Sequence, residues 1–238
     1  MPRSGGRKSA LSMDWHSLDR VLAMAATVAF AVTAVMAVRG DRDVDLFGAT
    51  VLGLITAVGG GTIRDVILDV PVFWATDLSY VWWAVAASVS AIYARRLFAT
   101  RHLNSLMEYL DGFGAAMFGI QATGKVWDLG FAVPAGPVML GVITAIGGGL
   151  IRDTLAGRTT LLMRPELYAI PVMLGCILFT VVLAYLPEYR VSGALLCILL
   201  TFGLRAAAIH WNLKVPGWMT VSTATGAAAV AQDEAVGE

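Results

Sequence analysis

Residues 51–65 of the chain read VLGLITAVGGGTIRD, and residues 139–153 read MLGVITAIGGGLIRD. The two stretches are identical at 11 of 15 positions, at a constant offset of 88 residues. The same offset relates Phe30 to Phe118. Chance is a poor explanation for this match, so the sequence predicts two copies of one structural unit.

The amino-acid composition indicates a membrane protein. Of 238 residues, 58% are hydrophobic and 14% are charged, with 17 basic and 17 acidic residues and a mean hydropathy of +0.73. A soluble domain carries about 25% charged residues. The composition therefore excludes an ordinary soluble enzyme, a disordered chain and a nucleic-acid binder that works by excess positive charge.

Seven apolar stretches follow one another along the chain. They are Val21–Val38, Leu46–Ile63, Leu78–Ala94, Gly112–Gly124, Leu129–Ile151, Leu167–Pro187 and Val191–Leu213. A membrane-spanning helix needs about 20 residues, and the fourth stretch reaches that length if its helix begins near Leu103 and includes Glu108 and Asp111. The stretches lack strand alternation, so we predict an all-α membrane protein with seven transmembrane helices.

The repeat divides these helices into two groups of three. Because three is an odd number, the second copy enters the membrane in the opposite orientation, which gives two inverted three-helix repeats and a seventh helix. The predicted boundaries are an N-terminal tail at 1–16, the first repeat at 17–98, the second repeat at 99–187, the seventh helix at 188–213 and a disordered C-terminal tail at 214–238.

Seven spans place the two ends of the chain on opposite sides of the membrane. Six lysine and arginine residues fall on the side of the N-terminus and nine on the other side, if those within the repeated motif are left out. The positive-inside rule then predicts that the N-terminus is outside and the C-terminus is inside.

Three glycines lie within the second span of each copy. They are Gly59, Gly60 and Gly61 in the first and Gly147, Gly148 and Gly149 in the second. Each glycine costs about 0.8–1 kcal/mol relative to alanine inside a helix, so the triplets predict kinked or unwound second and fifth helices that offer backbone groups to a pathway. Close helix packing is the alternative. Thr56 and Thr144 could line the kinks or bond to carbonyls of their own helices.

An arginine and an aspartate follow each triplet, as Arg64-Asp65 and Arg152-Asp153. An ionisable residue at mid-span costs about 2.5–3.5 kcal/mol and needs a partner or water. Neighbouring residues point about 100° apart on a helix, so we expect the members of each pair not to face one another. Pairing between the repeats and bonds to freed carbonyls both remain open. The four residues either shape the field of a pathway or form an ionic clasp that fixes the kinks.

The fourth span carries the polar side chains that we consider candidates for gating. Asp111, Gln121 and Lys125 lie in it, and Lys125 shares a helix face with Gln121. At the 88-residue offset, Asp111 corresponds to Ala23 and Gln121 to Thr33, so the second copy is the more polar. The alternative for Lys125 is a lysine that extends to the membrane interface.

The doubled GGGxIRD motif, together with RDVDLFG at 42–48 and the segment Phe118–Lys125, resembles the prokaryotic trimeric intracellular cation (TRIC) channels. The resemblance implies a homotrimer in the inner membrane of a prokaryotic cell. It also implies a potassium-conducting pore in each subunit, lined by the kinked second and fifth helices, and matches Lys125 to a basic residue of the fourth helix.

The same family is also described as glycine transporters, which leaves a secondary carrier of a small zwitterion as the alternative. The sequence contains no catalytic, metal-binding or phosphate-binding motif, so we expect neither an enzyme nor a resident cofactor, and no nucleic acid partner. The expected small partners are potassium or sodium ions and membrane lipid.

Overall fold

A computed structural model of the chain describes residues 14–38, 45–97, 103–164 and 167–214. These residues form eight α-helices and two 3-10 turns. The α-helices are α1 (Trp15–Ala37), α2 (Leu46–Ile67), α3 (Phe73–Thr76), α4 (Ser79–Leu97), α5 (Leu103–Asp128), α6 (Ala135–Leu155), α7 (Ala169–Tyr185) and α8 (Arg190–His210). The turns are η2 (Leu161–Met163) and η3 (Pro187–Tyr189).

Local capping fixes where the first two helices begin. Asp14 precedes α1 and accepts a hydrogen bond from the Ser17 N–H at 3.0 Å, while Asp45 precedes α2 and accepts from the Gly48 N–H at 2.7 Å. Such bonds satisfy backbone donors that have no partner within the helix. Bonding to Ser17 also lowers the pKa of the Asp14 carboxyl below its ordinary value.

Among the described residues, four helical segments are long and apolar enough to cross a membrane. They are α1, α2, α6 and the segment Pro187–His210, which consists of η3 and α8. Helices α4 and α7 are apolar but shorter. Helix α5 begins at Leu103 and has 26 residues, so the start expected for the fourth stretch is confirmed. That all seven long helices span the membrane stays a prediction.

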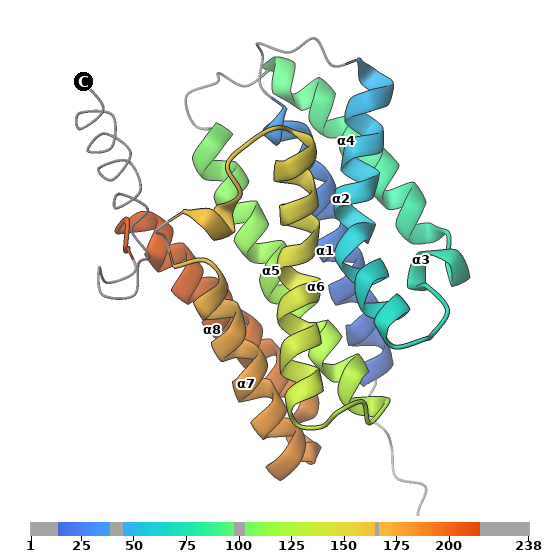
Figure 1. Ribbon diagram of the computed structural model, residues 1–238, viewed down its shortest axis with the longest axis vertical. Coiled ribbons are helices and arrows are strands. Elements are labelled where there is room, and N and C mark those ends of the chain that lie inside the picture. The colour runs from blue at the N-terminus through green and yellow to red at the C-terminus, as the bar shows by residue number, and fades with distance from the viewer. Residues whose placement is uncertain (1–13, 39–44, 98–102, 165–166, 215–238) are drawn as a thin grey trace, which may run out of the picture.

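The helices α1, α2 and α4 pack together in much the same way as α5, α6 and α7 (Figure 1). Helix α4 packs against α1 and α2, and α7 packs against α5 and α6. Helix α8 packs against α7 and α5. The C-terminal ends of α2 and α6 lie at opposite ends of the bundle (Figure 1).

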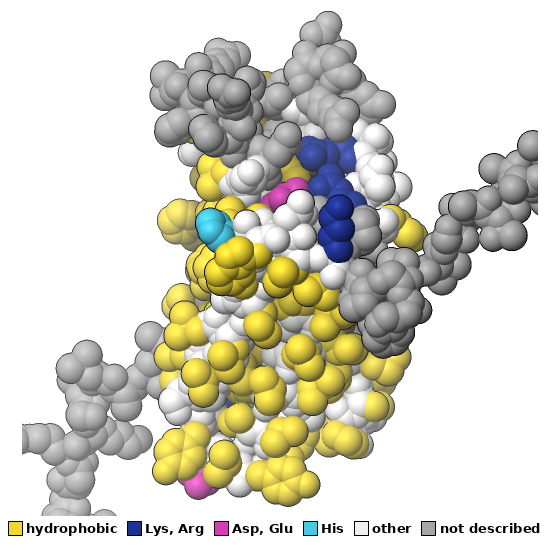
Figure 2. Space-filling view, turned by 90° about the vertical axis from the view of Figure 1, so that its left-hand side faces the viewer, with side chains coloured by type: hydrophobic (Ala, Val, Ile, Leu, Met, Phe, Trp, Pro, Cys, Tyr) yellow, Lys and Arg dark blue, Asp and Glu magenta, His cyan; other side chains and the backbone are white. Residues whose placement is uncertain are grey.

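The surface formed by α7 and α8 is apolar over most of its height (Figure 2). It includes Leu178 at 46%, Leu196 at 58% and Leu199 at 67% exposure. Soluble monomers rarely expose continuous apolar surfaces of this size, whereas the acyl chains of a bilayer would cover it.

Helices α2 and α6 remain α-helical through their glycine triplets, so the predicted local unwinding is not observed. A Cβ atom on Gly60 would clash with the carbonyl oxygen of Thr144, and one on Gly148 would clash with the carbonyl oxygen of Thr56. The lack of side chains lets the two backbones touch. The packing alternative therefore explains the two central glycines.

The threonines before the triplets bond within their own helices. The Thr56 hydroxyl donates to the Leu52 carbonyl at 2.7 Å, and the Thr144 hydroxyl donates to the Leu140 carbonyl at 2.6 Å. Both side chains are buried at the contact between α2 and α6. The alternative in which the hydroxyls bond to backbone carbonyls is the one that the structure shows.

Candidate functional site

Arg64 and Asp65, in the last turn of α2, pair with each other. The Arg64 Nε donates to Asp65 Oδ1 at 2.8 Å, and its Nη1 donates to Gln121 Oε1 at 2.8 Å. The expectation that these neighbours do not face each other is wrong, because the long arginine side chain folds back to reach the carboxylate. The same guanidinium also bonds across to α5, so it links two helices.

Asp65 holds two further groups. Lys125 Nζ lies 2.7 Å from its Oδ1, and the backbone N–H of Phe73 donates to its Oδ2 at 2.9 Å. The Asp65 side chain is fully buried, whereas the Lys125 side chain is 27% exposed. On the other side of Gln121, the amide Nε2 donates to Asp19 Oδ1 at 2.9 Å. This charged network joins α1, α2, α5 and the start of α3.

A second buried network surrounds Arg152 near the C-terminal end of α6. Arg152 Nε donates to Asp153 Oδ1 at 2.9 Å, and Nη1 donates to Asp111 Oδ1 at 2.6 Å and to Thr33 Oγ1 at 2.9 Å. Asp153 Oδ2 accepts the Leu161 N–H at 3.2 Å. Arg152 and Asp111 are both fully buried, so each buried charge lies beside an opposite charge, while Asp111 Oδ2 and Arg152 Nη2 have no hydrogen-bond partner among the described residues.

The two networks correspond to each other at the 88-residue offset. Arg64 in the first copy bonds to Gln121 in the second. Its counterpart Arg152 bonds to Thr33, which is the counterpart of Gln121. In both copies the second oxygen of the aspartate accepts a backbone N–H eight residues further along the chain. Pairing of either arginine with the aspartate of the other copy does not occur.

The first of these networks opens onto a cavity. This cavity has a volume of about 470 Å³ and lies between the N-terminal end of α1 and the C-terminal ends of α2 and α5. Its charged and amide lining includes Asp19, Arg64, Gln121, Lys125 and Asp128. Three residues singled out from the sequence thus line one space, and of the described residues that line it, none is a triplet glycine.

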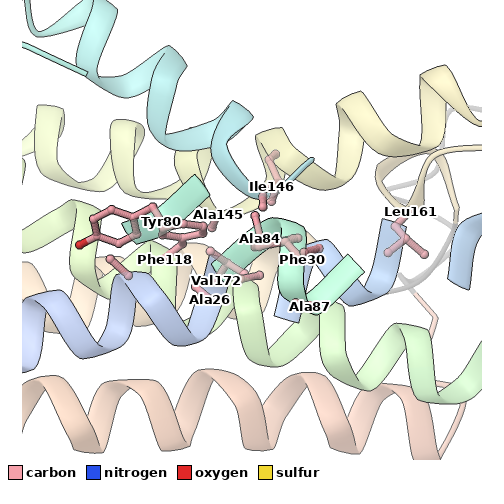
Figure 3. Close-up of a cluster of buried hydrophobic side chains, with 14 of the residues drawn as sticks. Ala26, Phe30, Tyr80, Ala84, Ala87, Phe118, Ala145, Ile146, Leu161 and Val172 are labelled. Carbon is pink, nitrogen blue, oxygen red and sulfur yellow. The ribbon is translucent and has the colours of Figure 1, made fainter. Parts of the chain in front are cut away.

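Aromatic side chains, among them Phe73, Tyr80 and Phe118, line the cavity. Phe118 lines the cavity, and its ring stacks on Phe30 with centroids 5.9 Å apart (Figure 3). Phe118 lies between Asp111 and Gln121 on α5. On α1, Phe30 lies between Asp19 and Thr33, two positions that are about 21 Å apart by helical rise. An apolar layer therefore separates the two charged networks.

Three side chains of this site were missed in the sequence: Asp19, Phe73 and Asp128. Asp19 lies one turn inside α1, just before the apolar stretch, and a lone carboxylate at that place was the only signal. Phe73 lies in the connection after α2, where no pattern of residues points to a role. Thr33, by contrast, could be found as the counterpart of Gln121 at the repeat offset.

Comparisons with known proteins agree with the repeat spacing. A family model described as "Glycine transporter" matches residues 20–96 and 108–184, two segments whose boundaries are offset by 88 residues. The inner membrane protein YadS of Escherichia coli is 37% identical over 195 residues, which cover 80% of this chain and 91% of that protein.

Solved structures resemble the fold closely. The TRIC trimeric intracellular cation channel orthologue from Rhodobacter sphaeroides has a TM-score of 0.77 and 29% identity, covering 83% of this chain and 100% of that chain. A further structure, of a TRIC cation channel, has a TM-score of 0.73 and 25% identity, covering 86% and 98%. With the apolar helices, these similarities identify an integral membrane protein.

Proposed function

The chain belongs to the family described as glycine transporter, which includes the prokaryotic TRIC channels, and from that premise we propose that it is a potassium-conducting cation channel. The observation that carries the proposal is the cavity of about 470 Å³, which is lined by charged side chains from α1, α2 and α5. Ionisable groups inside a membrane protein pair with one another or line a hydrated path, and they often mark an ion pathway.

The proposed pore runs from this cavity, past the Phe30–Phe118 stack, toward the network around Arg152. Helices α2 and α6 line it, and each subunit of a homotrimer contains one pore. In this interpretation the structure is closed, because the aromatic layer and the contact between Gly60 and Gly148 leave no polar route through the centre. Opening separates the two triplets and exposes their backbone groups to water.

The charges around the cavity favour weak ion binding. Asp19 and Asp65 offset the positive charges of Arg64 and Lys125, and Asp128 forms an ion pair with Arg190 at 2.6 Å. A conducting site must bind ions weakly enough to release them. A nearly balanced set of charges meets that requirement better than an excess of either sign.

A carrier of a small zwitterion such as glycine is the second candidate function. The observation in its favour is that Asp19 and Lys125 line the same cavity. A carboxylate could bind an ammonium group while the lysine binds a carboxylate. Such a site would saturate with glycine and would not produce discrete current steps.

The proposal also includes the arrangement in the membrane. Seven spans, formed by the long helices, build two inverted repeats and a final helix in the prokaryotic inner membrane, with the N-terminus outside and the C-terminus inside. Potassium or sodium ions and lipid are its small partners. The reciprocal bonds of Arg64 and Arg152 support a pseudo-twofold relation between the repeats.

The test is electrical. The purified protein is reconstituted in a planar bilayer under a potassium chloride gradient, and current steps and reversal potential are recorded. Discrete steps that reverse near the potassium equilibrium potential are expected. Silence at all voltages, together with saturable glycine uptake into proteoliposomes, would replace the channel by the carrier.

A further inference from the structure

The connection between α2 and α4 returns to the bundle and inserts an aromatic ring. Phe73, the first residue of α3, lines the cavity and packs against Gly61 of α2, where a Cβ atom would clash with its ring. Its ring lies 4.9 Å from that of Tyr80 and 6.4 Å from that of Phe118, both edge to face. Phe73 therefore extends the apolar layer at the inner end of the cavity.

A single carboxylate fixes the position of this ring. Asp65 Oδ2 accepts the Phe73 N–H at 2.9 Å, and Asp65 Oδ1 lies 2.7 Å from Lys125 Nζ. The Arg64 guanidinium lies 5.9 Å from the centre of the Phe73 ring. A charged residue at the cavity surface is thus connected to the aromatic layer through one aspartate.

The second copy has the same backbone bond without the rest of this arrangement. Leu161 takes the place of Phe73, is buried, and donates its N–H to Asp153. The counterpart of Lys125 is Ala37, which has no charge to offer to Asp153. The two ends of the proposed pathway are therefore closed by different side chains.

We propose that Phe73 is a gating residue, whose ring closes the inner end of the cavity and is held there by the bond between its N–H and Asp65. The inference rests on the proposed channel function. It adds that Phe73 is the part of the aromatic layer that moves when the pore opens. Residues Phe118 and Phe30 belong to the interiors of long helices. Phe73 belongs to a four-residue helix, so it can move without displacing a transmembrane segment.

The experiment compares the Phe73→Ala variant with the unmodified protein in planar bilayers. Loss of the ring removes contacts present only in the closed state, so open probability is expected to rise about tenfold, which equals about 1.4 kcal/mol in the closed-to-open equilibrium. The reversal potential in a potassium gradient stays unchanged. Phe73→Leu, which keeps apolar bulk, gives a smaller increase and also serves if the alanine variant fails to fold.

Phe113→Ala is the matched control. This ring pairs edge to face with Phe202 at 5.7 Å and lines an outer groove rather than the cavity. The open probability of the Phe113→Ala variant should equal that of the unmodified protein. If the unmodified protein conducts and the Phe73 variants show its open probability, the gate is refuted and the channel stands. If the unmodified protein is silent as well as every variant, the channel itself is refuted; if only the Phe73 variants are silent, the gate is refuted.

Discussion

Two buried arginines bond to the aspartates that follow them and also reach a second helix. A guanidinium has five N–H donors, which allows it to bond to a neighbour and to another helix at the same time. Arg64 joins α2 to α5 in this way, and Arg152 joins α6 to α1 and α5. The helical direction of Cβ atoms does not predict these pairs, because a long side chain can turn back at a helix end.

Replacing Arg152 by methionine should be strongly destabilising. The change leaves the carboxylates of Asp111 and Asp153 buried without their cation, which costs about 3–5 kcal/mol. Thermal unfolding in detergent measures the loss. The control is Arg164→Met, since Arg164 and Glu108 form a partly exposed pair at 2.9 Å and such pairs contribute about 0–1 kcal/mol. Equal losses in the two variants would contradict this account.

Replacing Lys125 by alanine should raise the unitary potassium current. The change removes a positive charge from the cavity wall, and at low ionic strength we expect an increase of about twofold that diminishes at high salt. Lys125→Arg keeps the charge and should keep the current. Unchanged current in the alanine variant at low salt would mean that the lysine only pairs with Asp65 and does not set the field of the pathway.

The crossing of α2 and α6 is decided by backbone contact rather than by side chains. Each central glycine faces a threonine carbonyl of the other helix. The sequence predicted that these triplets are special, and it offered unwinding and close packing as explanations. Only the packing partner of each central glycine distinguishes the two explanations, and that partner is distant in the chain, Thr144 for Gly60 and Thr56 for Gly148.

Alanine at Gly60 or at Gly148 should destabilise the fold. The added methyl group has to push the helices apart, and overpacking of this kind costs about 1–3 kcal/mol. Gly203 in α8 provides the control, because a Cβ atom there has no neighbour within 4 Å, and alanine favours a helix by about 1 kcal/mol. Melting temperatures should fall for the first two variants alone. A loss in the Gly203 variant of the same size would refute the packing argument.

At the scale of the whole molecule, periodicity and hydropathy predicted most of the helices. The start of α5 at Leu103 agrees with one continuous helix that includes Glu108 and Asp111. The site was only partly predictable. Gln121 and Lys125 were found because they are polar in an apolar span. Phe73 was not found, because its position in the cavity depends on the path of the connection after α2. The sequence pattern does not predict that path.

The orientation of the whole molecule can be tested directly. A fluorescent protein that matures only in the cytoplasm should fluoresce when fused to the C-terminus and remain dark when fused to the N-terminus. Fluorescence from both fusions would mean an even number of spans and would exclude the inverted repeat with a seventh helix.

The unlike networks at the two ends of the bundle carry an electrical consequence. A partly exposed lysine and an aromatic ring border one end, whereas a buried arginine network and a leucine border the other. An ion that enters from one side meets a different field from an ion that enters from the other. In identical solutions on both sides, the open protein should therefore rectify, passing unequal currents at equal and opposite voltages.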